Sequence, residues 1–187
     1  PSERRKFLDI ELSQMERLYL YQLTNYNKIL VQRNNLLKQI RFQNNLIDTL
    51  EAWDVQLVKY GSEVIRYREK FIKHLGEVCQ KIHNKLTGGK EQILLEYDRD
   101  VGYDSYLTEL EKKRQKDLKY STTTVGPHRD DISFIVNGID IRKYGSQGQQ
   151  RTAALSLKLA QIQLMREVMK ELSLIHISEP TRPISIS

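Results

Sequence analysis

The chain has 187 residues, enough for one domain or for one domain with an arm. Charged residues make up 29% of it and the formal net charge is +6, which favours a polyanionic partner, nucleic acid before membrane, although a solvated basic protein has the same composition. The single cysteine, Cys79, excludes an internal disulfide and fits the reducing cytoplasm, and the apolar runs are too short to span a bilayer, which takes about 20 residues.

Two long stretches have the apolar spacing of amphipathic helices. Between residues 13 and 40, and again between residues 46 and 86, apolar side chains recur at steps of mostly three and four. Ser13 and Glu16 have the spacing of a capping box, although an earlier helix start stays open, and "TGG" at 87–89 supplies a helix stop. Since a short polar link joins the two stretches, we expect an antiparallel hairpin that packs against a third helix and makes residues 1–89 a helical arm.

The periodicity changes after this helix stop. "EQILLEY" at 91–97 is typical of a strand, residues 105–119 of a helix, and "DISFIVNGIDIR" at 131–142 of a hairpin. Asn137 and Gly138 both accept the positive φ that a tight hairpin turn requires. A further helix is expected from Gly148 to about Leu172. The sequence therefore predicts an α+β fold, in which a long antiparallel helical arm precedes a smaller lobe at residues 90–172.

The polar turn "GSQGQQ" at 145–150 precedes this last helix. The first amides of a helix have no partners within it, and together with the helix dipole they favour an anion. Ser146 adds a hydroxyl, and Gly145 and Gly148 let the backbone approach a phosphate closely. A plain capped helix start with Ser146 as the N-cap explains the same spacing. Both interpretations stay open from the residues alone.

The predicted helix at 105–119 is strongly basic. Its cations either contact the phosphate backbone of a nucleic acid or simply solvate the helix, and they are Lys112, Lys113, Arg114, Lys116 and Lys119. No aromatic residue is interleaved with them, so the sequence predicts no stacking platform for single strands here.

Two further motifs are weaker. "GPHRDD" at 126–131 favours a turn that orders the following strand, with Arg129 paired to an Asp or aimed at an anion, over a metal site, because His128 has no second His at ligand spacing. "TGGKEQ" at 87–92 is not a phosphate-binding loop, because Asn84 and Glu91 stand where the pattern requires Gly and Ser or Thr. We predict neither a metal ligand nor a catalytic residue in this chain.

Three stretches together carry a resemblance to a known family. They are "PSERRKFLDIELSQ" at 1–14, "TTTVGPHRDDISFIVNG" at 122–138 and "YGSQGQQRTAALSLKLAQIQL" at 144–164, and "RNNLLK" and "WDVQLVKYG" in the arm fit as well. In this order and at these separations they resemble the RecF family of bacterial DNA replication and repair proteins. The resemblance covers residues 1 to about 170.

This resemblance implies a specific nucleotide site. The family is similar to the heads of ABC and SMC ATPases, and "SQGQQ" takes the place of their signature motif, which grips the γ-phosphate of an ATP held mainly by the other subunit. It implies Ser146, Gly148 and Gln149 as ATP contacts in a homodimer, and residues 90–172 as part of an ATPase head. It also implies DNA gaps and recombination mediator proteins as partners, in the response to DNA damage known as the SOS response.

The chain also departs from the family pattern. The phosphate-binding loop is expected upstream of Pro1, and the chain opens without Met or a signal peptide, so we expect the interior of a longer protein. Where the family has an apolar strand ending in paired acids that hold Mg²⁺, this chain has "SLIHISEPTRPISIS". We expect residues 173–187 to be a non-native or disordered tail. The fragment alone is therefore expected to be inactive as an ATPase.

Two other functions would each explain only part of the sequence. A non-enzymatic coiled-coil interaction protein would explain the two long helices but has no use for residues 126–164. A complete, different phosphotransfer enzyme would need a phosphate-binding loop within the chain, and the sequence has none.

Overall fold

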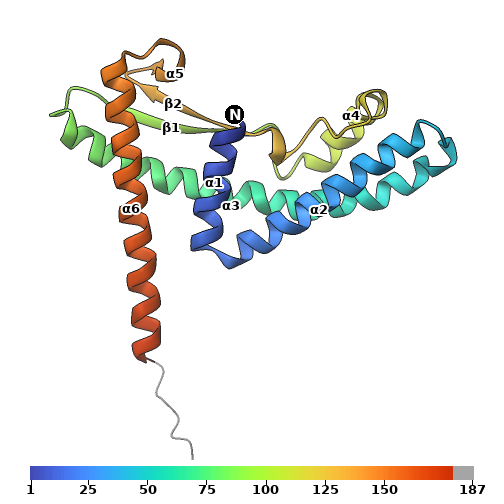
Figure 1. Ribbon diagram of the computed structural model, residues 1–187, viewed down its shortest axis with the longest axis horizontal. Coiled ribbons are helices and arrows are strands. Elements are labelled where there is room, and N and C mark those ends of the chain that lie inside the picture. Colours follow the sequence, from blue (N-terminus) through green and yellow to red (C-terminus); the bar gives the residue numbers. More distant parts are fainter. Residues whose placement is uncertain (179–187) are drawn as a thin grey trace, which may run out of the picture.

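The computed structural model describes residues 1–178, and their fold is α+β, as the sequence predicts (Figure 1). Helix α2, Arg17–Ile40, and helix α3, Leu50–Leu86, run antiparallel and side by side to form the arm, and the short 3-10 turn Asn44–Thr49 joins them (Figure 1). Helix α4, Tyr106–Tyr120, packs against the outer part of both, which supplies the expected third helix.

The first helical stretch differs from the prediction at its start. Helix α1, Ser2–Met15, precedes α2 and is turned away from it at Glu16, whose backbone is extended at φ −137° (Figure 1). The Glu16 carboxylate accepts a hydrogen bond from the amide of Leu18, at 3.3 Å. Glu16 therefore caps α2 itself, so Ser13 and Glu16 do not form a capping box, and the first helix begins earlier, at Ser2. The break lets Leu8 and Leu12 of α1 turn into the core.

Three antiparallel strands form a small sheet in the order β1-β2-β3, from Ile93–Asp98, Asp131–Val136 and Ile139–Asp140. Leu95 of β1 lies opposite Phe134 of β2. The turn between β2 and β3 has φ 49° at Asn137 and φ 81° at Gly138, which confirms the predicted hairpin turn.

Two helices follow the sheet. Helix α5, Ile141–Tyr144, is one short turn, and helix α6, Gln147–Ser178, packs across α3 (Figure 1). The expected end of this helix near Leu172 is too early, because the helix continues to Ser178. The predicted tail, residues 173–187, thus begins within α6, and its part at 179–187 lies outside the described residues.

One hydrophobic core runs along α3 and joins the arm to the sheet. Leu57, Val64 and Leu75 of α3 are buried in it, together with Ile93 of β1 and Ala160 of α6. Residues on both sides of position 89 thus contribute to the same core. The division into an arm at 1–89 and a head lobe at 90–172 stays a prediction.

A buried charge cluster fixes the outer part of the arm. The guanidinium of Arg33 is fully buried and donates to Asp54 at 2.6 Å, to Asp117 at 2.8 Å and to Thr123 at 2.8 Å. Arg114 donates to the second oxygen of Asp54 at 2.9 Å. The cluster pairs two cations with two carboxylates, so it joins α2, α3 and α4 without a net buried charge.

The "GPHRDD" segment is the turn that the sequence predicts. The 3-10 turn Pro127–Arg129 leads directly into β2. Burial lowers the pKa of His128, so its neutral ring accepts from the Tyr26 hydroxyl at 2.6 Å and donates to the Thr123 carbonyl at 3.1 Å. Both ring nitrogens are thus engaged by protein groups. Arg129 is exposed and contacts the Thr123 carbonyl at 3.5 Å rather than an Asp.

We expect Arg33→Met to lower the free energy of unfolding by about 3–5 kcal/mol, because it leaves buried carboxylates without their main partner. Urea unfolding followed by circular dichroism measures this. The control is Arg66→Met, which removes an exposed ion pair with Glu63 and should cost less than about 1 kcal/mol. Equal unfolding midpoints for the two variants would contradict the account of the cluster.

Candidate functional site

The turn at 145–150 is held in place from its N-terminal side. Asp140 caps α5 and accepts hydrogen bonds from the Arg142 amide at 3.0 Å and from its guanidinium at 2.7 Å. The Arg142 guanidinium lowers the pKa of Asp140 to about 2, so this carboxylate is ionised at neutral pH. Arg142 also donates to the Ile132 carbonyl of β2, at 2.8 Å. Helix α5 is therefore anchored to the sheet, and this fixes the position of Gly145, which follows it.

Gly145 is required by packing. A Cβ at this position would lie 2.6 Å from the carbonyl oxygen of Ile141, which no side chain tolerates. The Gln150 side chain reaches back and donates to the same Ile141 carbonyl at 2.9 Å and to the Gly145 carbonyl at 3.2 Å. Hydrogen bonds within the segment thus close the turn, and Gly145 is required for the fold itself.

Ser146 and Gln149 form a reciprocal cap at the start of α6. The Gln149 amide donates to Ser146 Oγ at 3.2 Å, and the Ser146 amide donates to Gln149 Oε1 at 3.1 Å. This is the capping box of an ordinary helix start. A serine hydroxyl that accepts one hydrogen bond still has its own proton to donate. The cap therefore orients Ser146 without preventing it from binding an anion.

Gly148 differs from Gly145, because nothing in the fold requires it. A Cβ there would have Ser146 Oγ as its nearest neighbour, at 3.8 Å, so an alanine fits without a clash. Ser146 and Gly148 are both exposed, and Gln149 is half-buried. The start of α6 thus presents backbone amides, a hydroxyl and an uncovered glycine on the surface, which is a suitable arrangement for a phosphate.

An apolar hollow lies beside this helix start, and sequence reasoning missed it. It has a volume of about 280 Å³ and lies between β2, α5 and the first three turns of α6. No periodicity predicts it, because the hollow depends on how α5 places the helix against the sheet. Its lining residues are Phe134, Ile141, Arg142, Gln150, Ala153, Ala154 and Leu157.

The basic residues of α4 fall into two groups. Arg114 turns inward to Asp54, with which it forms part of the buried cluster. The other four are exposed, and of these Lys112 pairs with Glu109 on the surface at 2.8 Å. The exposed lysines are Lys112, Lys113, Lys116 and Lys119. Four of the five predicted contacts are therefore presented to solvent, while Arg114 has a structural role.

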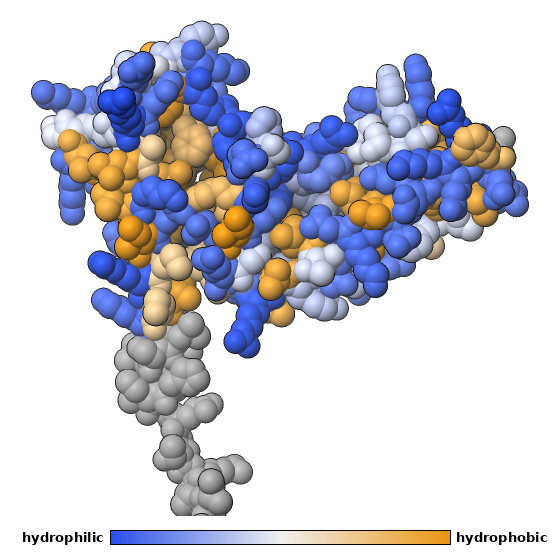
Figure 2. Space-filling view, viewed as in Figure 1, coloured by the Kyte–Doolittle hydropathy of each residue, from blue (hydrophilic) through white to orange (hydrophobic). Residues whose placement is uncertain are grey.

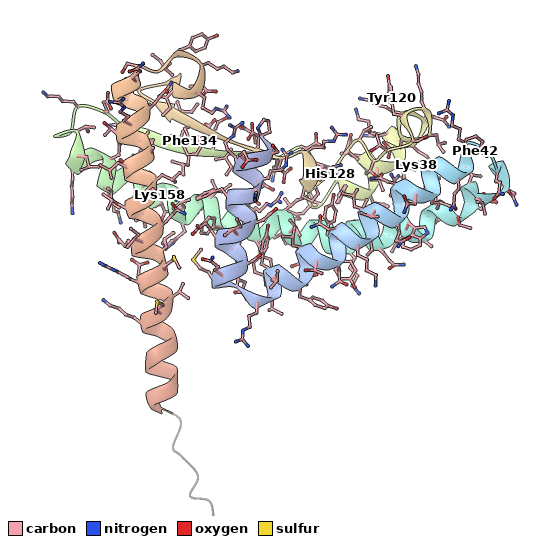
Figure 3. The ribbon with its side chains drawn as sticks, viewed as in Figure 1. Lys38, Phe42, Tyr120, His128, Phe134 and Lys158 are labelled. Atoms are coloured by element: carbon pink, nitrogen blue, oxygen red, sulfur yellow. The ribbon has the colours of Figure 1, made fainter. Side chains whose placement is uncertain are left out.

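The two candidate regions lie far apart. Helix α4 lies beside the outer half of the arm, and α6 begins at the opposite end of the molecule (Figure 1). The structure therefore does not combine Ser146, Gly148 and Gln149 with the basic residues in one site. Exposed side chains that sequence reasoning missed lie near the outer end of the arm: Lys38, Phe42 and Tyr120 (Figure 3).

Within residues 1–178, no three His, Cys, Asp or Glu side chains come together as metal ligands would. No helix in the same range combines the length and the hydropathy that crossing a membrane requires.

The chain is similar to known proteins over most of its length. It is 53% identical over 171 residues to the DNA replication and repair protein RecF of Lachnoclostridium phytofermentans, covering 91% of this chain and 48% of the relative. It is also 53% identical over 167 residues to RecF of Agathobacter rectalis, covering 89% of this chain and 46% of the relative. The chain thus spans about half the length of the curated relatives it matches. No protein-family model matches it.

The fold agrees with this likeness. The solved structure of the recombination mediator protein RecF-ATP in the RecFOR pathway superposes on this chain with a TM-score of 0.87 at 36% identity. The superposition covers 91% of this chain and 48% of the solved one. Sequence and fold therefore agree, and over about nine-tenths of its length this chain belongs to the RecF family of DNA replication and repair proteins.

Proposed function

We propose that this chain contributes the signature half of an ATP site that two subunits of a DNA repair and replication ATPase share. The observation that carries the proposal is the contrast between Gly145, which the fold requires, and Gly148, which it does not. A glycine that is exposed and sterically free at a helix start is explained by a ligand that must come close to the backbone. RecF-ATP, at a TM-score of 0.87, supports ATP as that ligand.

The half-site supplies donors for a phosphate. The amides of the first turn of α6 lack partners within the helix, and the Ser146 hydroxyl keeps a proton to donate. These groups stabilise negative charge, but none of them activates water or binds Mg²⁺. We therefore assign ATP hydrolysis to the assembled dimer, in which the partner subunit supplies the phosphate-binding loop and the Mg²⁺ ligands.

We assign DNA to the exposed lysines of α4, which we call the lysine face: Lys112, Lys113, Lys116 and Lys119. Lysines on one helix neutralise successive phosphates and release counterions, and such binding does not depend on base sequence. DNA and recombination mediator proteins are the partners that the family suggests, and the cytoplasm is the compartment. Burial raises the pKa of the Cys79 thiol to about 12, so the thiol stays protonated and unreactive at neutral pH.

The glycine contrast predicts opposite effects of two identical substitutions. Gly148→Ala should leave the melting temperature of the chain unchanged or slightly raised, because alanine fits and favours the helix by about 0.5–1 kcal/mol. Gly145→Ala should lower the melting temperature clearly, because its Cβ meets the Ile141 carbonyl. Differential scanning calorimetry of both variants compares them. A clear loss of stability in Gly148→Ala would show that the fold itself needs this glycine.

In a full-length RecF-family ATPase that carries this half-site, Ser146→Arg should leave ATP binding by the separate subunit nearly intact and should abolish ATP-dependent dimerisation. The bulky cation fills the space beside Gly148 and removes the hydroxyl. Nucleotide-binding assays and sedimentation velocity measure the two effects. Gln56→Arg adds the same charge on exposed arm surface and should change neither. Equal loss of binding and dimerisation in Ser146→Arg would contradict a site shared across an interface.

The lysine face predicts salt-sensitive DNA binding by the chain. Lys113→Gln with Lys116→Gln should weaken binding to a duplex and reduce the slope of log K against log salt by about 2, since each phosphate contact contributes roughly 0.9. The matched control is Lys28→Gln with Lys81→Gln, which removes two exposed lysines elsewhere. Fluorescence anisotropy at several salt concentrations gives the slope. An equal reduction in the control would show that only the net charge matters.

A further inference from the structure

The outer end of the arm combines exposed aromatic rings with exposed cations. We propose that this surface, formed by Lys38, Arg41, Phe42, Lys119 and Tyr120 and called the arm-tip surface, binds unpaired DNA by stacking its bases on the two rings. The inference deepens the DNA binding assigned above and rests on that part of the proposed function. It adds a site and a substrate class that the lysine face of α4 does not provide.

The fold brings residues together here that lie nearly 80 positions apart in sequence. Leu118, near the end of α4, packs on the apolar cluster at the end of the arm, whose buried members are Leu36, Leu37, Ile40 and Leu50. This contact places the end of α4 against the end of α2. Tyr120, the last residue of α4, and Phe42, two residues beyond the end of α2, therefore lie at the same end of the arm (Figure 3).

Lys38 lies on the face of α2 that meets the segment after α4. Asn34 of α2 accepts hydrogen bonds from the amide and the hydroxyl of Thr123, both at 2.7 Å, so the segment after α4 is held against this face of α2. Lys38 lies one helical turn beyond Asn34 on the same face. Its ammonium group therefore extends toward the end of α4, which carries Lys119 and Tyr120.

Both rings are open to solvent. Phe42 is 86% exposed and Tyr120 is 59% exposed. A single exposed apolar side chain is ordinary. Two exposed aromatic rings at one end of a helical arm, with cations next to each, are instead typical of an interaction surface. Figure 2 shows an apolar patch at this end of the arm, surrounded by hydrophilic side chains.

The chemistry of the neighbours favours DNA over a protein as the occupant. Phe42 follows Arg41, and the ammonium of Lys119 lies 5.7 Å from the centre of the Tyr120 ring. The exposed lysines of α4 continue this positive charge along the arm, away from the tip. Aromatic rings between cations are the arrangement on which single-stranded nucleic acids bind, because rings stack bases while cations hold phosphates.

Unpaired bases are required because a duplex keeps its bases stacked on each other. Its outer surface offers phosphates to the cations but no base face to a ring. Asp48 and Glu51 are exposed carboxylates on the adjoining corner between the 3-10 turn and α3. Their repulsion of phosphates directs the strand toward the side of the arm formed by α2 and α4.

The test compares single-stranded with double-stranded DNA on the full chain. A fluorescent oligo(dT) of 15 nucleotides and a 15-base-pair duplex are titrated with the parent chain and with the double variant Phe42→Ala, Tyr120→Ala. We expect the double variant to lose about five-fold or more in affinity for the single strand and less than about two-fold for the duplex. Tyr144→Ala removes an equally exposed ring, 79% exposed, outside the surface and should change neither affinity.

A conservative variant and a spectroscopic signal separate stacking from a structural role. Tyr120→Phe keeps the ring and should keep the affinity for the single strand. An oligonucleotide that carries 2-aminopurine should lose fluorescence on binding to the parent chain, because stacking quenches the base, and the double variant should abolish that quenching.

Each other outcome overturns the inference. In one such outcome, the double variant binds the single strand as tightly as the parent does, while Lys113→Gln with Lys116→Gln weakens binding. The proposed DNA binding then stands, but the arm-tip surface does not stack bases and is left as a protein-docking surface. Equal losses for single strand and duplex would show backbone contact without stacking. If the parent chain binds no DNA, this inference and the DNA part of the proposed function both fail, while the ATP half-site is unaffected.

Discussion

The burial of Arg68 in the middle of α3 is the constraint on which the arrangement of the chain depends. A guanidinium that is almost fully buried destabilises the fold unless its donors are paired. Arg68 donates to Asp9 of α1 at 2.7 Å, to Tyr19 of α2 at 3.1 Å, and to the carbonyl of Pro127 and the carboxylate of Asp130 before β2, at 2.6 and 3.0 Å. One side chain therefore holds α1, α2 and the start of β2 against α3.

This arrangement explains how the proposed half-site obtains a fixed geometry. Asp130 also accepts hydrogen bonds from the Tyr97 hydroxyl of β1 and from the Asp100 amide, so the strands are tied to the same centre. The salt bridge between Arg4 of α1 and Asp131 holds the pKa of that carboxyl well below its usual range and adds a second link to β2. The hairpin then leads through α5 to the turn at 145–150, and α6 packs back across α3.

The same geometry separates the two proposed activities. The proposed phosphate donors at the start of α6 and the proposed DNA surfaces of the arm lie at opposite ends of α3, which is continuous over 37 residues (Figure 1). Because one core runs along this helix, the start of α6 and the inner part of the arm are parts of one packed unit. If two subunits close around ATP as proposed, each arm therefore moves together with its proposed half-site.

Local patterns predicted the long helices, the hairpin at Asn137-Gly138 and the polar turn, because periodicity and turn chemistry act over a few residues. The tertiary pairings were beyond such patterns. In sequence, Arg114 is a candidate phosphate contact or a solvating charge, and no local pattern pairs Arg33 with an acid. Only the packing of α2, α3 and α4 shows that both neutralise buried carboxylates, those of Asp54 and Asp117. Likewise, nothing in the sequence places Phe42 near the basic helix α4, which begins more than 60 residues later. Their proximity follows only from the packing of Leu118 of α4 against the end of α2.

The central claim is that the turn at Ser146 acts on ATP held by another subunit, and subunit mixing tests it most directly. In a full-length RecF-family ATPase with this half-site, the Ser146→Arg variant is mixed with a variant whose phosphate-binding loop is disabled. A mixed dimer contains one composite site in which both halves are intact, whereas each variant alone contains none. The account predicts that ATPase activity, absent from either variant, returns on mixing. No recovery in mixtures that form heterodimers would contradict it.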